Sequence, residues 1–188
     1  MTVSSAGDSE ELIHQAYELY HQREYSRARE LFEEAFDGVD PYVAVHLGWI
    51  YNQKDLPQYD PVKSEEYYVI AAKAGLTSAH HGLAGLYYEQ GKKDKALHHC
   101  SEASQAGNAE CSWALQSIYK REGQLDLHKL VLNRAAEQGH PLAVQRRSID
   151  DILLRNGARH FVRGLRLYFL NIRPLFRYVM KTRIDGSS

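Results

Sequence analysis

Histidines are the residues of this chain with the clearest potential for metal chemistry. The sequence holds 10 of them, and two groups, His80-His81 and His98-His99-Cys100, fall on helical stretches that can approach one another. A transition-metal site needs three or four converging ligands, whereas adjacent residues on a helix point about 100° apart. The pattern therefore predicts partly exposed helical histidines, and we expect no metal ion and no other cofactor.

Catalytic motifs are missing from the sequence as well. It has no Gly-rich phosphate loop, no paired-carboxylate signature and no HExxH motif, and no motif places Cys100 or Cys111 beside a histidine or asparagine partner. Two cysteines are too few for a disulfide framework, so we expect small buried thiols in a reducing, cytosolic protein. The sequence predicts that the chain is not an enzyme.

Thirteen tyrosines are present, and four of them set the register of a helical repeat. The four are Tyr20, Tyr51, Tyr87 and Tyr119. Four residues before each lies Ala16, Leu47, Leu83 or Leu115, and eight residues before lies Leu12, Val43, Ala79 or Cys111. Positions spaced by four and eight share one helix face, so this stripe predicts the core side of four first helices. Most tyrosines are then packing residues, although some could line a concave peptide-binding groove.

A second helix follows each first helix, and it ends in a recurring pattern of small residues. The matching triplets are Ala71, Ala72 and Gly75, then Ala103, Ser104 and Gly107, then Ala135, Ala136 and Gly139. Small residues allow two helices to approach closely, and glycine at a helix end adopts the left-handed conformation that closes the last turn. The sequence thus predicts helix-turn-helix units of about 32 residues, close to the period of known helical repeats.

The second unit, from Val43 to Gly75, resembles the Sel1-like branch of the tetratricopeptide-repeat superfamily. The residues that carry the resemblance are Leu47, Gly48, Tyr51, Asp60, Lys63, Ala71, Ala72 and Gly75. Across residues 11–147 the resemblance implies an all-α, right-handed α-solenoid of about four helix-turn-helix repeats. It also implies a protein-protein interaction scaffold, without naming the partner.

The repeat divides the chain into four segments. We expect a disordered N-terminal tail over residues 1–9, the repeat array over residues 10–151, a basic amphipathic helical tail over residues 152–184, and a disordered end over residues 185–188. The first helix should begin near Asp8 or Ser9. Pro141 suits the first position of a fifth first-helix, after which no second helix with the small-residue pattern follows.

Charge separates the array from its tail. Residues 1–151 carry 15 Lys and Arg against 23 Asp and Glu, whereas residues 152–188 carry 8 against 1. No stretch reaches the roughly 20 apolar residues of a spanning helix, and the N-terminus lacks the pattern of a secretory signal. The two parts therefore face different surroundings.

The tail combines a cationic stripe with aromatic and aliphatic residues. The residues with potential for docking are Arg155, Arg159, Arg163, Arg166, Phe169, Arg173, Phe176, Arg177 and Lys181. On a helix the cations fall within one stripe, opposite an apolar side, which is typical of a segment at an anionic membrane interface. Pro174 is expected to weaken or kink this helix near Leu170.

Three interpretations of the tail stay open at this point: a cap on the last repeat, a membrane-docking segment, and an interface for a protein partner or a second copy of the chain. Nucleic acid is disfavoured because the acidic repeats repel it. We therefore expect a non-enzymatic, cytoplasmic scaffold held at the inner face of a membrane by its tail. The alternative is an accessory or regulatory subunit of an enzyme, such as a membrane-bound biosynthetic one, with a tail that only caps.

Overall fold

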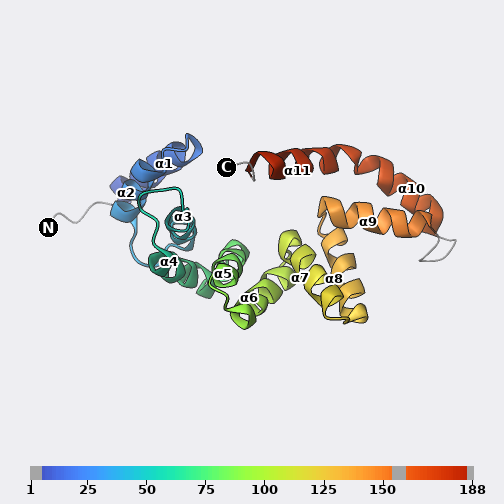
Figure 1. The fold of residues 1–188 in the computed structure, drawn as a ribbon. Coiled ribbons are helices and arrows are strands. Elements are labelled where there is room, and N and C mark those ends of the chain that lie inside the picture. Colours follow the sequence, from blue (N-terminus) through green and yellow to red (C-terminus); the bar gives the residue numbers. More distant parts are fainter. Residues whose placement is uncertain (1–5, 154–159, 186–188) are drawn as a thin grey trace. The chain divides into compact units, whose positions relative to one another are not determined.

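The computed structural model describes residues 6–153 and 160–185, and over this part of the chain it holds eleven α-helices and no strand (Figure 1). Four helix pairs come first: α1 (Ala6–His21) and α2 (Tyr25–Ala35), α3 (Pro41–Tyr51) and α4 (Pro61–Lys73), α5 (Thr77–Glu89) and α6 (Lys93–Gln105), α7 (Ala109–Arg121) and α8 (Leu125–Glu137). They are followed by α9 (Pro141–Ile152), α10 (Phe161–Leu170) and α11 (Ile172–Asp185). The prediction of an all-α repeat fold is confirmed.

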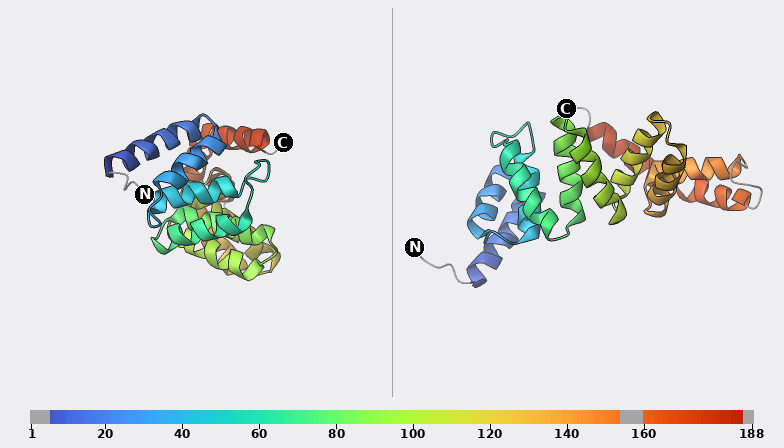
Figure 2. Two further views of the ribbon diagram at one scale, coloured as in Figure 1. Left: turned by 90° about the vertical axis from the view of Figure 1, so that its left-hand side faces the viewer. Right: turned by 90° about the horizontal axis from the view of Figure 1, so that it is seen from below.

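The helices belong to two compact units, residues 1–99 and residues 100–188, and the division of the chain falls within α6. Each unit is described by itself below. Figure 2 gives two further views of the helices; α1 packs against α2, and α7 against α8.

Several helices begin with a side chain that caps the helix N-terminus. Asp40 accepts hydrogen bonds from the backbone N–H of Tyr42 and Val43, and Pro41 occupies the first helical position of α3. Asp60 and Pro61 do the same for α4. A side-chain cap of this kind contributes about 1 kcal/mol to helix stability. The expanded turn of the second unit, residues 52–60, therefore ends in a well-defined helix start.

The central positions of the predicted repeat register are buried. Leu47, Leu83 and Leu115 are at most 2% exposed, and Ala71, Ala103 and Ala135 are fully buried. Glycines close the second helices in the left-handed conformation that the pattern predicted, with φ of +85° at Gly75, +102° at Gly107 and +85° at Gly139.

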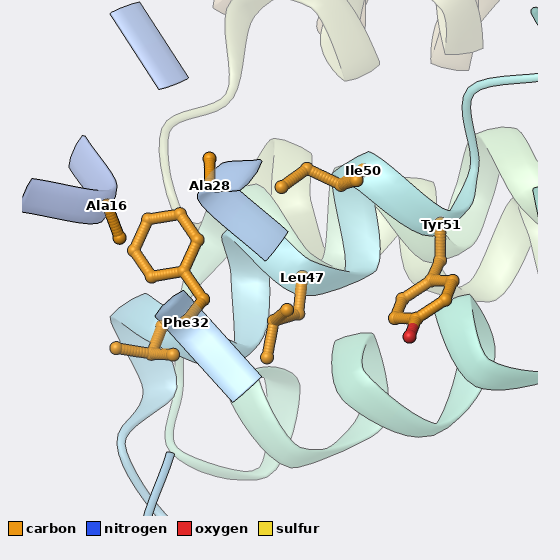
Figure 3. Packing of buried hydrophobic residues seen from close by; sticks show 7 residues of the cluster. Ala16, Ala28, Phe32, Leu47, Ile50 and Tyr51 are labelled. Carbon is orange, nitrogen blue, oxygen red and sulfur yellow. The ribbon is translucent and has the colours of Figure 1, made fainter. Parts of the chain in front are cut away.

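One buried hydrophobic cluster of the first unit surrounds Phe32. Figure 3 shows the Phe32 ring of α2 beside Ala16 of α1 and Ala28, with Leu47 and Ile50 of α3 in the same cluster. All five side chains are fully buried. Because the small side chains of Ala16 and Ala28 leave room for the large Phe32 ring, α1, α2 and α3 pack closely around it.

A second cluster of the same unit surrounds Tyr68, which is 4% exposed. Its ring lies against Gly48 of α3 and Gly82 of α5, where a Cβ atom added to either glycine would collide with it. Gly48 was predicted to define the repeat, and Tyr68 supplies the physical reason. Glycine is needed there because an aromatic side chain of α4 occupies the space of a side chain on α3.

In the second unit, α7, α8 and α9 share a small core. Leu132, Ala135, Ala136 and Ala143 form its buried cluster. Cys100 and Cys111 are both buried and free, as expected, and the Cys100 thiol donates to the Cys111 carbonyl oxygen at 3.4 Å. The predicted first-helix start at Pro141 is also confirmed.

Two boundaries differ from the sequence prediction. α1 begins at Ala6, inside the segment expected to be disordered, so Asp8 lies in its first turn, where a negative charge favours the helix N-terminus. At the other end α11 continues to Asp185. The break predicted near Leu170 is present, since the tail is two helices that meet at Asn171, three residues before Pro174. Proline lacks a backbone N–H donor, and it is tolerated in α11 because it lies in the first turn.

Candidate interaction surfaces

The two histidine groups approach one another through His80 and His99. His80 of α5 and His99 of α6 place their Nδ1 atoms 3.1 Å apart, and the His99 ring stacks on Tyr87 at 5.5 Å. Among the described residues, no group of three or more His, Cys, Asp or Glu side chains is arranged to hold a metal ion.

The tail packs against the rest of the second unit mainly through α10, which lies along α9. Gly164 is buried in this contact, and a Cβ atom there would lie 2.9 Å from the Ser148 carbonyl oxygen and from the Ile152 backbone nitrogen. Helix backbones can approach this closely only where the side chain is absent. Gly164 therefore takes the role that small residues play in the earlier helix pairs.

An ion pair between Arg163 and Asp151 links α10 to α9. The guanidinium of Arg163 donates from Nε and Nη2 to the two carboxylate oxygens of Asp151 at 3.0 and 3.1 Å. The Asp151 side chain is fully buried, whereas that of Arg163 is 49% exposed. A two-point contact of this geometry holds both position and orientation.

The outer side of α11 and the end of α10 expose apolar residues beside cations. Phe169, Ile172, Phe176 and Met180 are 67%, 48%, 65% and 41% exposed. The neighbouring cations are also exposed: Arg166, Arg173, Arg177 and Lys181. Because Ile172, Phe176 and Met180 recur every four residues, as do Arg173, Arg177 and Lys181 one position later, the two rows run side by side along α11. We call these eight residues the outer ridge.

The predicted docking residues therefore separate into three groups. Arg166, Phe169, Arg173, Phe176, Arg177 and Lys181 lie on the outer ridge. Arg163 instead pairs with Asp151 of the same chain. Arg155 and Arg159 lie outside the described residues.

The inner side of α11 meets α7 and the start of α9. The Tyr178 hydroxyl donates to Glu110 Oε2 at 3.3 Å, and the Tyr178 ring packs edge-on against the His140 ring at 5.1 Å. His140 in turn stacks on Trp113 at 4.9 Å with the rings 14° from parallel. We call Glu110, Trp113 and His140 the tyrosine pocket; the sequence pattern did not predict it.

His140 has two roles in the pocket. Its Nδ1 caps α9 by accepting from the Ala143 backbone N–H, and its Nε2 lies 3.2 Å from Glu110 Oε2. The accepting Nδ1 is unprotonated, so Nε2 carries the hydrogen and donates it to Glu110. Burial lowers the pKa of His140, which Glu110 opposes only in part, and burial also raises the pKa of Tyr178.

This lowered pKa predicts a loss of stability in mild acid. The unfolded chain protonates His140 near pH 6.5, whereas the folded chain keeps the ring neutral to a lower pH. The free energy of unfolding should therefore fall as the pH drops below about 6.5. Urea unfolding should show a weaker fall for His140→Asn, because asparagine still caps the helix but does not titrate.

The exposed His14 provides the matched control. His14→Asn should keep the pH dependence of the unsubstituted chain. An equal pH dependence in His140→Asn and in the unsubstituted chain would show that His140 is not the group responsible.

The stacked helix pairs place the chain in the class of all-α helical-repeat solenoids, and its fold is similar to that of solved Sel1 repeat and TPR proteins. A Sel1 repeat protein from Oxalobacter formigenes is similar with a TM-score of 0.68 and 17% identity, over 93% of this chain and 76% of that one. A protective antigen of uropathogenic Escherichia coli strains, displaying an SLR fold, gives a TM-score of 0.69 and 21% identity. The alignment covers 87% of this chain but only 38% of the antigen.

YrrB, a TPR protein with an unusual peptide-binding site, gives a TM-score of 0.55 and 17% identity over 90% of each chain. At these identities the likeness concerns the fold alone. No protein-family model and no curated protein matches the sequence. Within the described residues no helix is both long and apolar enough to span a bilayer.

Proposed function

We propose that this chain is a non-enzymatic protein-interaction scaffold that docks on an anionic membrane surface through its outer ridge. The observation that carries the proposal is the exposure of Phe169, Ile172, Phe176 and Met180 beside four cations. In this proposal the repeats bind a protein segment while the ridge holds them at the cytoplasmic face of the inner membrane. The similarity to repeat proteins, one of them with a peptide-binding site, supports the scaffold part.

The chemistry of the ridge favours a lipid interface. The row of apolar side chains can enter the boundary between headgroups and acyl chains while the neighbouring row of cations stays among the phosphates. Each Lys or Arg near an anionic surface contributes about 1 kcal/mol, so four cations supply about 4 kcal/mol at low salt. Apolar insertion then adds to an attraction that is already substantial.

Charge also decides against two other occupants of the ridge. A second copy pairing through the same ridge would bring Arg173 and Arg177 close to their own counterparts, which is unfavourable. Nucleic acid would meet residues 1–151, whose net charge is −8. An anionic bilayer avoids both penalties because it contacts only the tail.

Vesicle sedimentation tests the membrane part. We expect the full chain to sediment with vesicles of phosphatidylcholine and phosphatidylglycerol but not with phosphatidylcholine alone, and to be released by salt. The double variant Arg173→Glu and Arg177→Glu should bind at least about tenfold more weakly, since it reverses two of the four ridge charges.

A matched control changes the net charge equally at exposed array positions. Lys120→Glu with Lys129→Glu should sediment like the unsubstituted chain, because α7 and α8 carry these residues outside the ridge. Equal weakening in the two double variants would refute a docking surface on the tail and leave only net charge as the cause. Equal sedimentation with both lipid mixtures would refute the anionic partner.

A further inference from the structure

The inner side of α11 packs against a site of the second unit that combines aromatic rings with a carboxylate. We infer that the tyrosine pocket of Glu110, Trp113 and His140 is a binding site for a tyrosine side chain carried on a basic helix of a partner protein. In the chain alone, Tyr178 of α11 occupies this site. The inference rests on the scaffold part of the proposed function and is independent of membrane docking.

The pocket offers tyrosine both an aromatic wall and a hydrogen-bond acceptor. The His140 ring stacks on Trp113 and its Nδ1 atom accepts from the Ala143 backbone N–H, so contacts outside α11 hold the wall in place. Glu110 is 48% exposed and points its Oε2 atom at the position of the Tyr178 hydroxyl. A tyrosine ring can thus pack against the wall while its O–H donates to the carboxylate, whereas phenylalanine, leucine and methionine have no donor for it.

Charge selects a basic carrier for that tyrosine. α11 presents Arg173, Arg177 and Lys181 on the same helix as Tyr178, and Glu110 lies at the rim of the pocket. The −8 charge of residues 1–151 attracts a basic segment over a longer range. α11 is therefore an example of the partner segment that the site fits.

Several observations indicate that α11 is held more weakly than α10. α10 is fixed by the close approach at Gly164 and by the two-point contact of Arg163 with buried Asp151. The polar contact from the inner side of α11 to Glu110 is a single hydrogen bond of 3.3 Å at a half-exposed carboxylate. The remaining inner side chains, Leu175 and Val179, stay partly exposed.

The junction between the two helices is itself anchored. Asn171 is 6% exposed, and its side-chain amide donates to the Pro141 carbonyl oxygen at 2.6 Å. α11 can therefore leave the pocket by turning about Asn171 while α10 stays on α9. Displacement by a partner needs no unfolding of the repeats.

A peptide-binding experiment without membranes tests the inference. The probe is a synthetic peptide of residues 171–185 with a fluorescent label, and the receptor is the full chain carrying Tyr178→Ala, which empties the pocket. Fluorescence anisotropy should show saturable binding of one peptide per chain. Affinity for the unsubstituted chain should be at least about tenfold weaker, because its own Tyr178 competes with the peptide. Undetectable binding to the Tyr178→Ala chain, or equal affinity for the two chains, would overturn the inference.

Matched changes locate the binding on both partners. Tyr178→Phe in the peptide should weaken binding about fivefold, the value of one lost hydrogen bond. Glu110→Gln in the receptor should weaken it by a similar factor, whereas Glu122→Gln, at an exposed position after α7, should not. An equal effect of the two receptor variants would contradict a site at Glu110.

Circular dichroism establishes that each receptor is folded. If Tyr178→Ala reduces the helix content, Tyr178→Phe in the full chain serves instead, because it removes only the hydroxyl contact to Glu110. The peptide should bind this chain more tightly than the unsubstituted one, and no gain in affinity would refute the pocket. Loss of peptide binding with intact vesicle binding would reject the pocket while leaving the membrane proposal standing.

Discussion

Gly82→Ala is expected to lower the free energy of unfolding by about 3 kcal/mol. A Cβ atom at this position of α5 would lie 2.6 Å from Cε1 and 2.8 Å from Cε2 of Tyr68, whose ring is 4% exposed. The ring is also held by Gly48 on α3, where an added Cβ would lie 2.8 Å from its Cδ1 atom. With glycine backbones on two sides, the ring cannot retreat without moving a helix. Chemical denaturation followed by circular dichroism measures the loss.

The same helix contains a matched control. Gly85 is exposed, and a Cβ atom there would meet nothing within 4 Å. Gly85→Ala should therefore stabilise the chain by about 1 kcal/mol through helix propensity alone. Removing the ring with Tyr68→Ala should abolish most of the cost of Gly82→Ala, because residues in contact are not additive. If both glycine variants were stabilising, close packing of Tyr68 between α3 and α5 would be wrong.

The repeat register could be predicted from the sequence, but the contact between Tyr68 and Gly82 could not. Positions such as Leu47, Leu83 and Leu115 recur at equal distances from their tyrosines, so one pattern predicts their burial. Gly82 lies five residues before Tyr87, where the preceding unit has His46 five residues before Tyr51. The contact is particular to one helix pair, and a repeat pattern carries no information about it.

The contacts of the tail with the repeats could not be predicted from the sequence either, because they join residues that lie far apart along the chain. Its amphipathic pattern predicted an apolar side and a cationic side, and α11 has both. Glu110 and Tyr178 are 68 residues apart, and their contact depends on how α11 turns back toward α7. His140 stands directly before Pro141 and could have been recognised as a helix cap. Nothing in the sequence indicates that its other nitrogen faces a carboxylate beside the tail.

Arg163→Leu is expected to lower the free energy of unfolding by about 2–3 kcal/mol, because the buried carboxylate of Asp151 would lose its two-point contact with the guanidinium. The value is below that of a fully buried pair because the Arg163 side chain is 49% exposed. Urea unfolding measures the loss. Adding Asp151→Leu should recover much of it, since an apolar pair avoids the cost of a buried charge.

Arg166→Leu is the matched control, because Arg166 lies one helical turn later on α10 and is exposed. Its effect on stability should stay within about 0.5 kcal/mol. In the vesicle assay Arg166→Leu should have the larger effect of the two variants, the reverse of their order in stability. Arg166→Leu removes one of the four ridge cations and should weaken binding about fivefold, whereas Arg163→Leu should leave it nearly unchanged while the chain is folded.

The reversal follows from the geometry of the two arginines. Both belong to the same cationic stripe of the sequence, yet the carboxylate of Asp151 neutralises Arg163 within the chain, so it contributes little field toward a bilayer. Arg166 keeps its charge at the surface. If Arg163→Leu weakened vesicle binding as much as Arg166→Leu in a chain shown to be folded, the division between a structural α10 contact and a docking ridge would be wrong. The whole stripe would then act as one electrostatic surface.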